Sequence, residues 1–165
     1  MKIEFDVKLY AKDLYLFNMY QAYKGMQGIL SLVLPAFIFW QAYVNWDKVS
    51  RETSLLNIGI GVLFLAYIPI TLLMRANKVV KKDRVLSKPL HYEFTEESIR
   101  VTQGEESAEF VWDNIYRMVT LRGLVLIYTN RINAYIIEKK QIADQYEDLA
   151  KLANAKLEKH RIKMK

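Results

Sequence analysis

Two long apolar stretches dominate the hydrophobic pattern of this sequence. Residues 26–44 and 54–74 contain no charged side chain, and a short charged turn, residues 47–53, separates them. A helix rises about 1.5 Å per residue, so either stretch covers roughly 30 Å, the thickness of a bilayer's hydrocarbon core. Backbone groups at that depth must be hydrogen-bonded within the chain, so the pattern predicts a transmembrane helical hairpin. Two buried helices of a soluble protein are the alternative.

The N-terminal segment changes its period once. Apolar and polar side chains alternate in residues 2–9, which is typical of a half-buried strand. A lone strand is unstable in water, so we expect it to pair with strands beyond the hairpin. From about Lys12 the pattern is helical, Asp13 is a candidate first-turn acid, and aromatic residues gather before residue 26 as at a membrane interface. We expect a helix that begins in the interface, with an amphipathic helix on the soluble domain as the alternative.

Short runs with a period of two return beyond Leu90, separated by turns. The expected strands are residues 91–94, 99–102, 109–112, 115–120, 124–129 and 134–137, with Phe110 and Trp112 on one face of the third. From Lys140 the period is helical, with an apolar stripe of Ile142, Tyr146, Leu149, Ala153 and Leu157. Acidic residues precede basic ones in this helix, as the helix dipole favours, so we expect it to continue into the basic tail.

These changes of pattern predict an α+β membrane protein. A two-helix transmembrane hairpin is joined to a bent antiparallel sheet that a C-terminal helix caps. We divide the chain into an N-terminal strand and interfacial helix at 1–25, the hairpin at 26–74, a basic juxtamembrane linker at 75–89 and a cytoplasmic domain at 90–165.

Positive charge collects directly after the second apolar stretch. The formal net charge is +6, and the cluster contains Arg75, Lys78, Lys81, Lys82 and Arg84. Because lysine and arginine concentrate on the cytoplasmic side of membrane proteins, we expect both termini of this multi-pass hairpin in the cytoplasm. The same cluster is a candidate site for anionic lipid headgroups, at about 1 kcal/mol per residue near the surface. Setting the topology alone is the alternative role.

Ser54, Asn57 and Gly61 fall on one face of the second predicted span. Small and weakly polar residues let membrane helices approach closely and hydrogen-bond across their interface. This face is therefore predicted to pack the two spans together or to pack a neighbouring copy in a homo-oligomer. Neither span contains an Asp, Glu, Lys, Arg or His, which counts against a proton or ion pathway.

The sequence lacks the residue patterns of several common catalytic and metal sites. The chain has no cysteine, and its two histidines, His91 and His160, have no partner at metal-ligand spacing. The sequence contains no glycine-rich phosphate loop, GxSxG or HExxH motif. Asp113 and Glu138 are isolated acids, more typical of a strand-end cap or an ion pair than of a catalytic pair. We expect no enzyme, cofactor or metal, and no nucleic-acid partner because the basic residues lie beside the predicted bilayer.

The order of these elements and four short segments resemble the YcxB-like family of small bacterial membrane proteins. The segments are FDVKLYAKDLYLF at 5–17, HYEFTEESIRV at 91–101, FVWDNIYRM at 110–118 and YIIEKKQI at 135–142. The third sits where the family has an aromatic residue followed by Ser/Asp-Asp/Glu-Ile. The last sits where the family has Ile-Pro-Lys-Arg, although this chain carries Glu138 at the proline. The resemblance implies a pleckstrin-homology-like (PH-like) soluble domain and a place in the bacterial cell membrane.

Two functions remain open at this stage. The first is a membrane-anchored, non-enzymatic module whose PH-like domain binds or regulates a partner protein, with immunity or regulation of a membrane system as a possible use. The second is an anionic-lipid-binding membrane protein. The turns at 96–98 and 103–106 carry Glu96, Glu97, Glu105 and Glu106, which would repel a phosphate there, and this favours the partner protein.

Overall fold

The computed structural model describes residues 2–82 and 88–164, except for the side chain of Lys82. Arg84 of the predicted basic cluster lies outside the described residues. The chain divides into two compact units. One contains Met1–Leu14 together with Lys78–Lys165, and the other contains Tyr15–Asn77.

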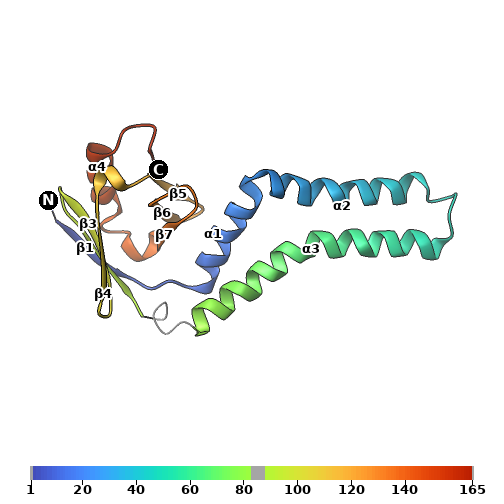
Figure 1. Cartoon of the computed structure of the whole chain (residues 1–165), viewed down its shortest axis with the longest axis horizontal. Helices are drawn as coiled ribbons and strands as arrows, with labels where there is room; N and C mark the ends of the chain where they lie inside the picture. Colours follow the sequence, from blue (N-terminus) through green and yellow to red (C-terminus); the bar gives the residue numbers. More distant parts are fainter. Residues whose placement is uncertain (1, 83–87, 165) are drawn as a thin grey trace. The chain divides into compact units, whose positions relative to one another are not determined.

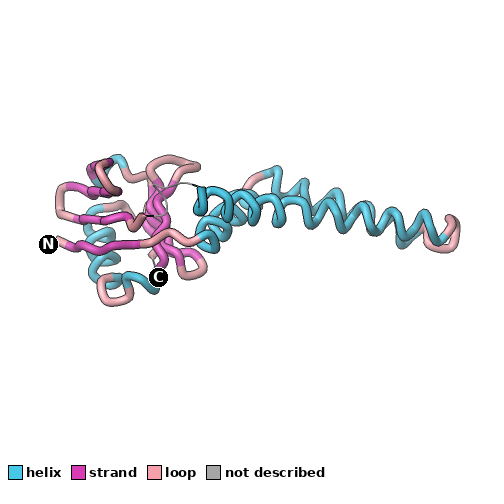
Figure 2. The backbone as a smooth tube through the Cα atoms, turned by 90° about the horizontal axis from the view of Figure 1, so that it is seen from below, coloured by secondary structure: helices cyan, strands magenta, loops and turns pink. Residues whose placement is uncertain are grey.

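The second unit is helical. Its helices are α1 (Ala11–Lys24), whose first turn belongs to the other unit, α2 (Met26–Val44) and α3 (Arg51–Lys82). Figures 1 and 2 show α2 and α3 side by side and running in opposite directions. The hairpin prediction is confirmed, and α2 has the predicted bounds. Residues 75–82, predicted as part of a linker, instead continue α3.

Side chains close the helix ends around the hairpin turn. The Asn45 side chain donates to the Gln41 carbonyl at 3.0 Å at the end of α2. The Ser50 hydroxyl accepts from the Thr53 N–H at 3.3 Å, which is the bond that an N-cap serine makes at the start of α3. At the start of α1, Asp13 accepts from the Tyr10 N–H at 3.2 Å, so it acts in the first turn as predicted. Burial raises the pKa of this carboxyl.

The first sheet contains four antiparallel strands, one of which comes from before the hairpin. Its order is β1 (Ile3–Val7), β2 (Leu90–Phe94), β3 (Ser98–Gln103) and β4 (Glu106–Val111). In the β1–β2 register, Ile3 faces Phe94 and Val7 faces Leu90. The predicted return of the N-terminal strand to the later strands is confirmed. Pairing also places the apolar side chains Ile3, Phe5 and Val7 in the core cluster.

The second sheet has the order β7-β6-β5-β8. Its strands are β5 (Arg117–Leu121), β6 (Leu124–Tyr128), β7 (Ala134–Glu138) and the short β8 (Ile162–Lys163), which runs parallel to β5. The expected single bent sheet is therefore two sheets. Between β7 and β8 the chain forms the 3-10 helix η2 (Lys139–Ile142) and the helix α4 (Tyr146–Lys156). The expectation that the last helix runs into the basic tail was wrong, because the chain extends at Leu157 and the tail pairs with β5.

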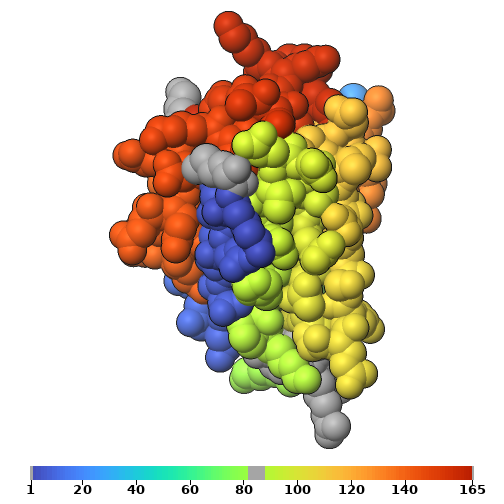
Figure 3. Space-filling view, turned by 90° about the vertical axis from the view of Figure 1, so that its left-hand side faces the viewer, coloured from blue at the N-terminus to red at the C-terminus, as the bar shows by residue number. Residues whose placement is uncertain are grey.

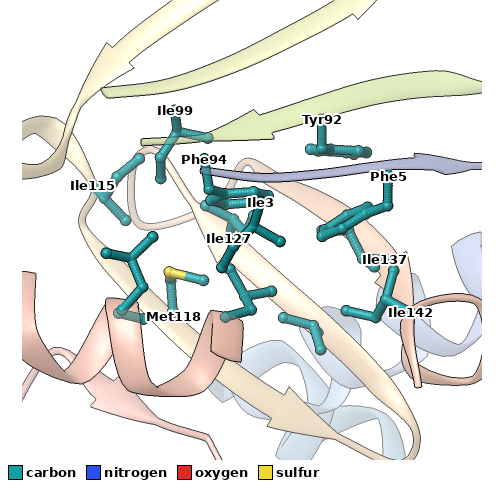
Figure 4. Packing of buried hydrophobic residues seen from close by; sticks show 14 of the residues in the cluster. Ile3, Phe5, Tyr92, Phe94, Ile99, Ile115, Met118, Ile127, Ile137 and Ile142 are labelled. Carbon is teal, nitrogen blue, oxygen red and sulfur yellow. The ribbon is translucent and has the colours of Figure 1, made fainter. Parts of the chain in front are cut away.

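The core of this unit lies between the two sheets (Figure 4). Aromatic rings of the first sheet meet aliphatic side chains of the second, and Phe5 lies 5.7 Å from Tyr92 and 5.5 Å from Phe94 between ring centroids. One face of α4 closes the core, as its apolar stripe predicted. The residues of the cluster with 1% or less of their surface exposed are Val7, Tyr92, Phe94, Ile99, Ile115, Met118, Val125, Ile127, Ile137, Ile142, Leu149 and Ala153.

Trp112 lies in the core as predicted, although not in a strand. Only 5% of it is exposed, and it begins a 3-10 turn, η1 (Trp112–Asn114), after β4 has ended. Its indole N–H donates to the Thr95 carbonyl at 2.9 Å. The tryptophan therefore ties the β2–β3 turn to the crossing between the sheets, and its partner satisfies the one polar atom that its burial would otherwise leave unpaired.

Candidate functional site

A row of charged side chains crosses the outer face of the first sheet. The register aligns Glu4 with Glu93, Glu93 with Arg100, and Arg100 with Glu109. Arg100 lies 3.1 Å from Glu109 and 3.9 Å from Glu93 in nitrogen-to-oxygen distance. Lys2 lies 3.0 Å from Glu93 and also pairs with Glu4. We call these five residues the charge row; it joins all four strands on the solvent side.

Pairing within the charge row shifts its pKa values. The hydrogen bond from the Ser98 hydroxyl, with the Arg100 guanidinium, holds the pKa of Glu109 below its ordinary value. The Lys2 ammonium does the same for Glu4. Exposed pairs of this kind add little to stability. Their consequence is that Glu4 and Glu109 stay ionised to a lower pH than ordinary glutamates do.

Beside the charge row lies a shallow hollow of about 530 Å³. Carboxylates dominate its lining, with Glu93, Glu96, Glu97 and Glu109 against the cations Lys2 and Arg100. Figure 3 shows this side of the unit, with β1 in blue, β2 and β3 in green and β4 in yellow. The surface is chemically suited to a partner that brings positive charge.

The two edges of the first sheet differ. β4 pairs with β3, and no described strand lies on its other side. At the β1 edge, the Gln141 side-chain amide of η2 exchanges two hydrogen bonds with the Lys8 backbone, both at 2.9 Å. A sheet edge with unpaired backbone groups accepts a strand from another chain. Both β1 and β4 are edge strands, but Gln141 blocks the β1 edge at Lys8, directly after the strand, so β4 is the more open edge for a partner.

The free backbone groups of β4 follow from its hairpin. Gly104 and Glu105 form a two-residue turn, so Gln103 and Glu106 make the first hydrogen-bonded pair and bonding alternates from there. Ser107, Glu109 and Val111 then direct their backbone N–H and C=O groups away from β3. Val111 is half exposed, while Phe110 packs on Tyr135 with ring centroids 5.6 Å apart.

A second contact joins the end of β7 to the N-terminal segment through Glu138. Its carboxylate accepts from the Lys12 ammonium at 2.6 Å and from the Gln141 amide at 3.1 Å. The Lys12 bond is the largest cause that holds the pKa of Glu138 below its ordinary value. The chain turns into η2 directly after Glu138.

The predicted lipid-headgroup residues lie at the end of α3. Arg75, Lys78 and Lys81 are exposed, and Lys82 is part of the helix. Ala76 in the same stretch is fully buried. The helix thus exposes its cations and buries an apolar side. Binding of lipid headgroups by these residues stays a prediction.

The predicted packing residues lie along the hairpin. Ser54 and Gly61 are buried and Asn57 is half-buried. A Cβ built on Gly61 would lie 2.7 Å from the Phe39 ring of α2, whereas one on Gly59 would meet nothing within 4 Å. The packing role of this face stays a prediction.

Sequence reasoning missed the buried face of α2. Gly28, Pro35 and Ala42 are its buried residues, and they recur every seven positions. Seven residues make about two helical turns, so these three share one face. This spacing of small residues was the available signal. Pairing of the C-terminal tail with β5 left no such signal in the sequence.

The hairpin helices are long and apolar enough to cross a membrane. Residues Met26–Val44 and Arg51–Lys81 meet the requirement by length and composition, and only 17% and 6% of their most apolar windows are buried. Large apolar side chains such as Leu30, Trp40, Leu63 and Tyr67 are exposed along them. A contiguous apolar surface of this kind is typical of membrane or protein contact. No group of metal-ligating side chains comes together within the described residues.

Part of the strand-rich unit matches a known protein family. Residues 94–153 match the model of the YcxB-like protein family. The matched segment runs from the end of β2 to within α4, so it covers β3 and β4 of the first sheet and β5, β6 and β7 of the second. No match was found among curated proteins or among solved structures.

Proposed function

We propose that this chain belongs to the YcxB-like family, whose model matches residues 94–153, and that it is a membrane-anchored, non-enzymatic interaction module. Its hairpin lies in the bacterial cell membrane, with both termini and the PH-like domain on the cytoplasmic side. The domain binds or regulates a partner protein, in immunity to or control of another membrane system. The partner lends β4 a further strand and carries basic side chains.

The observation that carries this proposal is the free edge of β4 beside the acidic hollow. Main-chain hydrogen bonds to the outward groups of Ser107, Glu109 and Val111 supply affinity, and the carboxylates of the hollow select basic side chains. The opposite edge, at Lys8, is covered by Gln141. The β4 edge is therefore the favoured place for strand addition.

The proposal is tested in the full chain, because β1 precedes the hairpin and a domain cut free after Met74 would lose it. A photo-crosslinking amino acid at Ser107 should trap a protein in native membranes. The same group at Glu147, exposed on α4, should trap much less. Equal labelling at the two positions would overturn the β4 edge as the binding site.

A proline at Ser107 separates edge pairing from other contacts. Ser107→Pro removes an outward N–H without touching the ladder with β3, so the crosslinked partner should be lost while the domain keeps its fold. Ser107→Ala keeps the N–H and is the matched control. A partner that binds Ser107→Pro as well as the unaltered chain rules out strand addition.

Anionic-lipid binding is the second candidate, and the exposed cations of α3 favour it. If it is the function, replacing Arg75, Lys78 and Lys81 by Gln should remove a preference of the reconstituted chain for anionic over neutral lipid. The preference should also fall with salt, because screening shortens to about 8 Å at physiological ionic strength. If the chain binds a protein, the variant keeps its partner.

A further inference from the structure

Two arginines line a second hollow, at the start of β5. This hollow, of about 440 Å³, is lined by Tyr116, Arg117, Glu158, His160 and Arg161. The first two residues lead into β5, and the other three lie between α4 and β8. Parallel pairing brings the groups together, because the Met118 N–H donates to the Arg161 carbonyl at 2.8 Å. The hollow is therefore a product of the tail's return to the sheet.

Among the described residues, no acid pairs with Arg117, which aromatic rings hold in place. Its guanidinium lies 4.2 Å from the centre of the Tyr128 ring and 5.9 Å from that of Tyr116. Its Nε and Nη2 atoms are buried and have no hydrogen-bond partner in the described part of the chain. Guanidinium nitrogens that are shielded from water and left unpaired are costly, and such a group in a folded protein calls for an acceptor nearby. The third nitrogen, Nη1, is not among these enclosed atoms.

Arg161 is likewise bonded without being neutralised. It donates to the carbonyls of Asp113, at 2.8 Å, of Tyr116, at 3.3 Å, and of Ile115. These acceptors carry no net charge. The hollow's one carboxylate, Glu158, instead lies 3.1 Å from the His160 ring. Within the described residues, the positive charges of both guanidiniums thus remain available to a ligand.

We propose that this hollow binds a phosphate group. A phosphate carries up to two negative charges and enough oxygens for two guanidiniums, and arginine is the residue that best matches such oxyanions. A monocarboxylate would neutralise only one of the two. The rings of Tyr128 and Tyr116 hold the Arg117 plane in advance, which lowers the entropy lost on binding. The phosphate is that of a soluble phosphate ester or of a lipid headgroup, since both offer the same oxygens.

The probe is inorganic phosphate, titrated into the full chain in phosphatidylcholine nanodiscs at constant ionic strength. We expect saturable binding by calorimetry at millimolar phosphate or below. Arg117→Gln should weaken it about tenfold or more, the range for a hydrogen bond to a charged group. Arg100→Gln is the matched control and should bind as the unaltered chain does, because Arg100 lies in the charge row of the other sheet. Absence of saturable binding, or equal binding by Arg117→Gln, overturns the site.

A gain of affinity guards against a variant that merely fails to fold. Glu158→Gln removes the carboxylate that repels the anion, so it should tighten phosphate binding severalfold. A misfolded protein cannot give that result. Unchanged or weaker binding by a folded Glu158→Gln protein counts against the site.

Nanodiscs that also contain phosphatidic acid distinguish the two sources. If the headgroup is the ligand, it occupies the hollow and inorganic phosphate no longer titrates. If a soluble ester is the ligand, the titration is unchanged. Either result supports a phosphate site, and neither depends on the β4 edge.

Discussion

Gly61 of α3 faces the ring of Phe39 on α2 so closely that a Cβ at Gly61 would lie 2.7 Å from that ring. Gly59, two residues earlier, has open space around it. We predict that Gly61→Leu weakens the hairpin by about 1–3 kcal/mol, the usual cost of overpacking, while Gly59→Leu leaves it unchanged. Unfolding of the full chain in mixed micelles, followed by loss of helix, measures both. Equal effects of the two leucines would show that this face does not pack the hairpin.

The second prediction concerns β1. Phe5 is 7% exposed and packs on Tyr92 and Phe94 across the sheet, so Phe5→Ala should destabilise the strand-rich unit by about 3–5 kcal/mol. Asp6→Ala, on the exposed side of the same strand, should cost far less. Thermal unfolding followed by near-ultraviolet circular dichroism reports the loss. If both variants melt alike, β1 does not belong to the core in solution.

The third prediction concerns the pH dependence of the Lys12–Glu138 pair. Because pairing lowers the pKa of Glu138 in the folded state, its stabilisation is present above the ordinary pKa of 4.5 and is lost as the pH falls through the lower folded value. At pH 7, Glu138→Gln should therefore be less stable than the unaltered chain by about 0.5–1 kcal/mol. Denaturant titrations at several pH values should show the gap closing below pH 4.5. If the difference in stability does not depend on pH, the effect of Glu138→Gln is steric rather than electrostatic.

The fourth prediction concerns the β5–β6 turn. Arg122 has φ of 49° and Gly123 has φ of 84°, the left-handed region that costs a residue with a Cβ about 1–2 kcal/mol. Arg122→Gly should relieve that strain and raise the melting temperature, while Arg122→Ala should not, because alanine keeps the Cβ. A glycine variant no more stable than the alanine variant would contradict the strain.

The fifth prediction is the topology. Lysine and arginine crowd the residues after the second span, so both termini should be cytoplasmic. A fluorescent protein that folds only inside the cell, fused after Lys165, should be bright. An alkaline phosphatase fused there should be inactive, and activity of the phosphatase would reverse the orientation.

Much of the fold could be read from local patterns. The uncharged stretches set the bounds of α2 and placed the second span within α3, because a long apolar run has few stable states besides a helix. Alternation gave the positions of β2, β3 and β6 to within a residue or two. The alternation gave the wrong structure at Trp112. Trp112 lies two residues after Phe110, and a continuing strand and a turn can both bury a side chain at that spacing.

The sequence by itself determined which segments bury apolar faces, because periodicity is a property of neighbouring residues. It also determined that β1 needed a partner beyond the hairpin, since its alternation leaves one apolar side uncovered. Only the tertiary structure decided which edges and charges meet. Gln141 bonds to the backbone at Lys8, and β4 remains an edge strand. Arg161, just before β8, donates a hydrogen bond to the Tyr116 carbonyl. These relations join residues far apart in the chain, where no local spacing constrains the backbone and packing of the whole unit sets the distance.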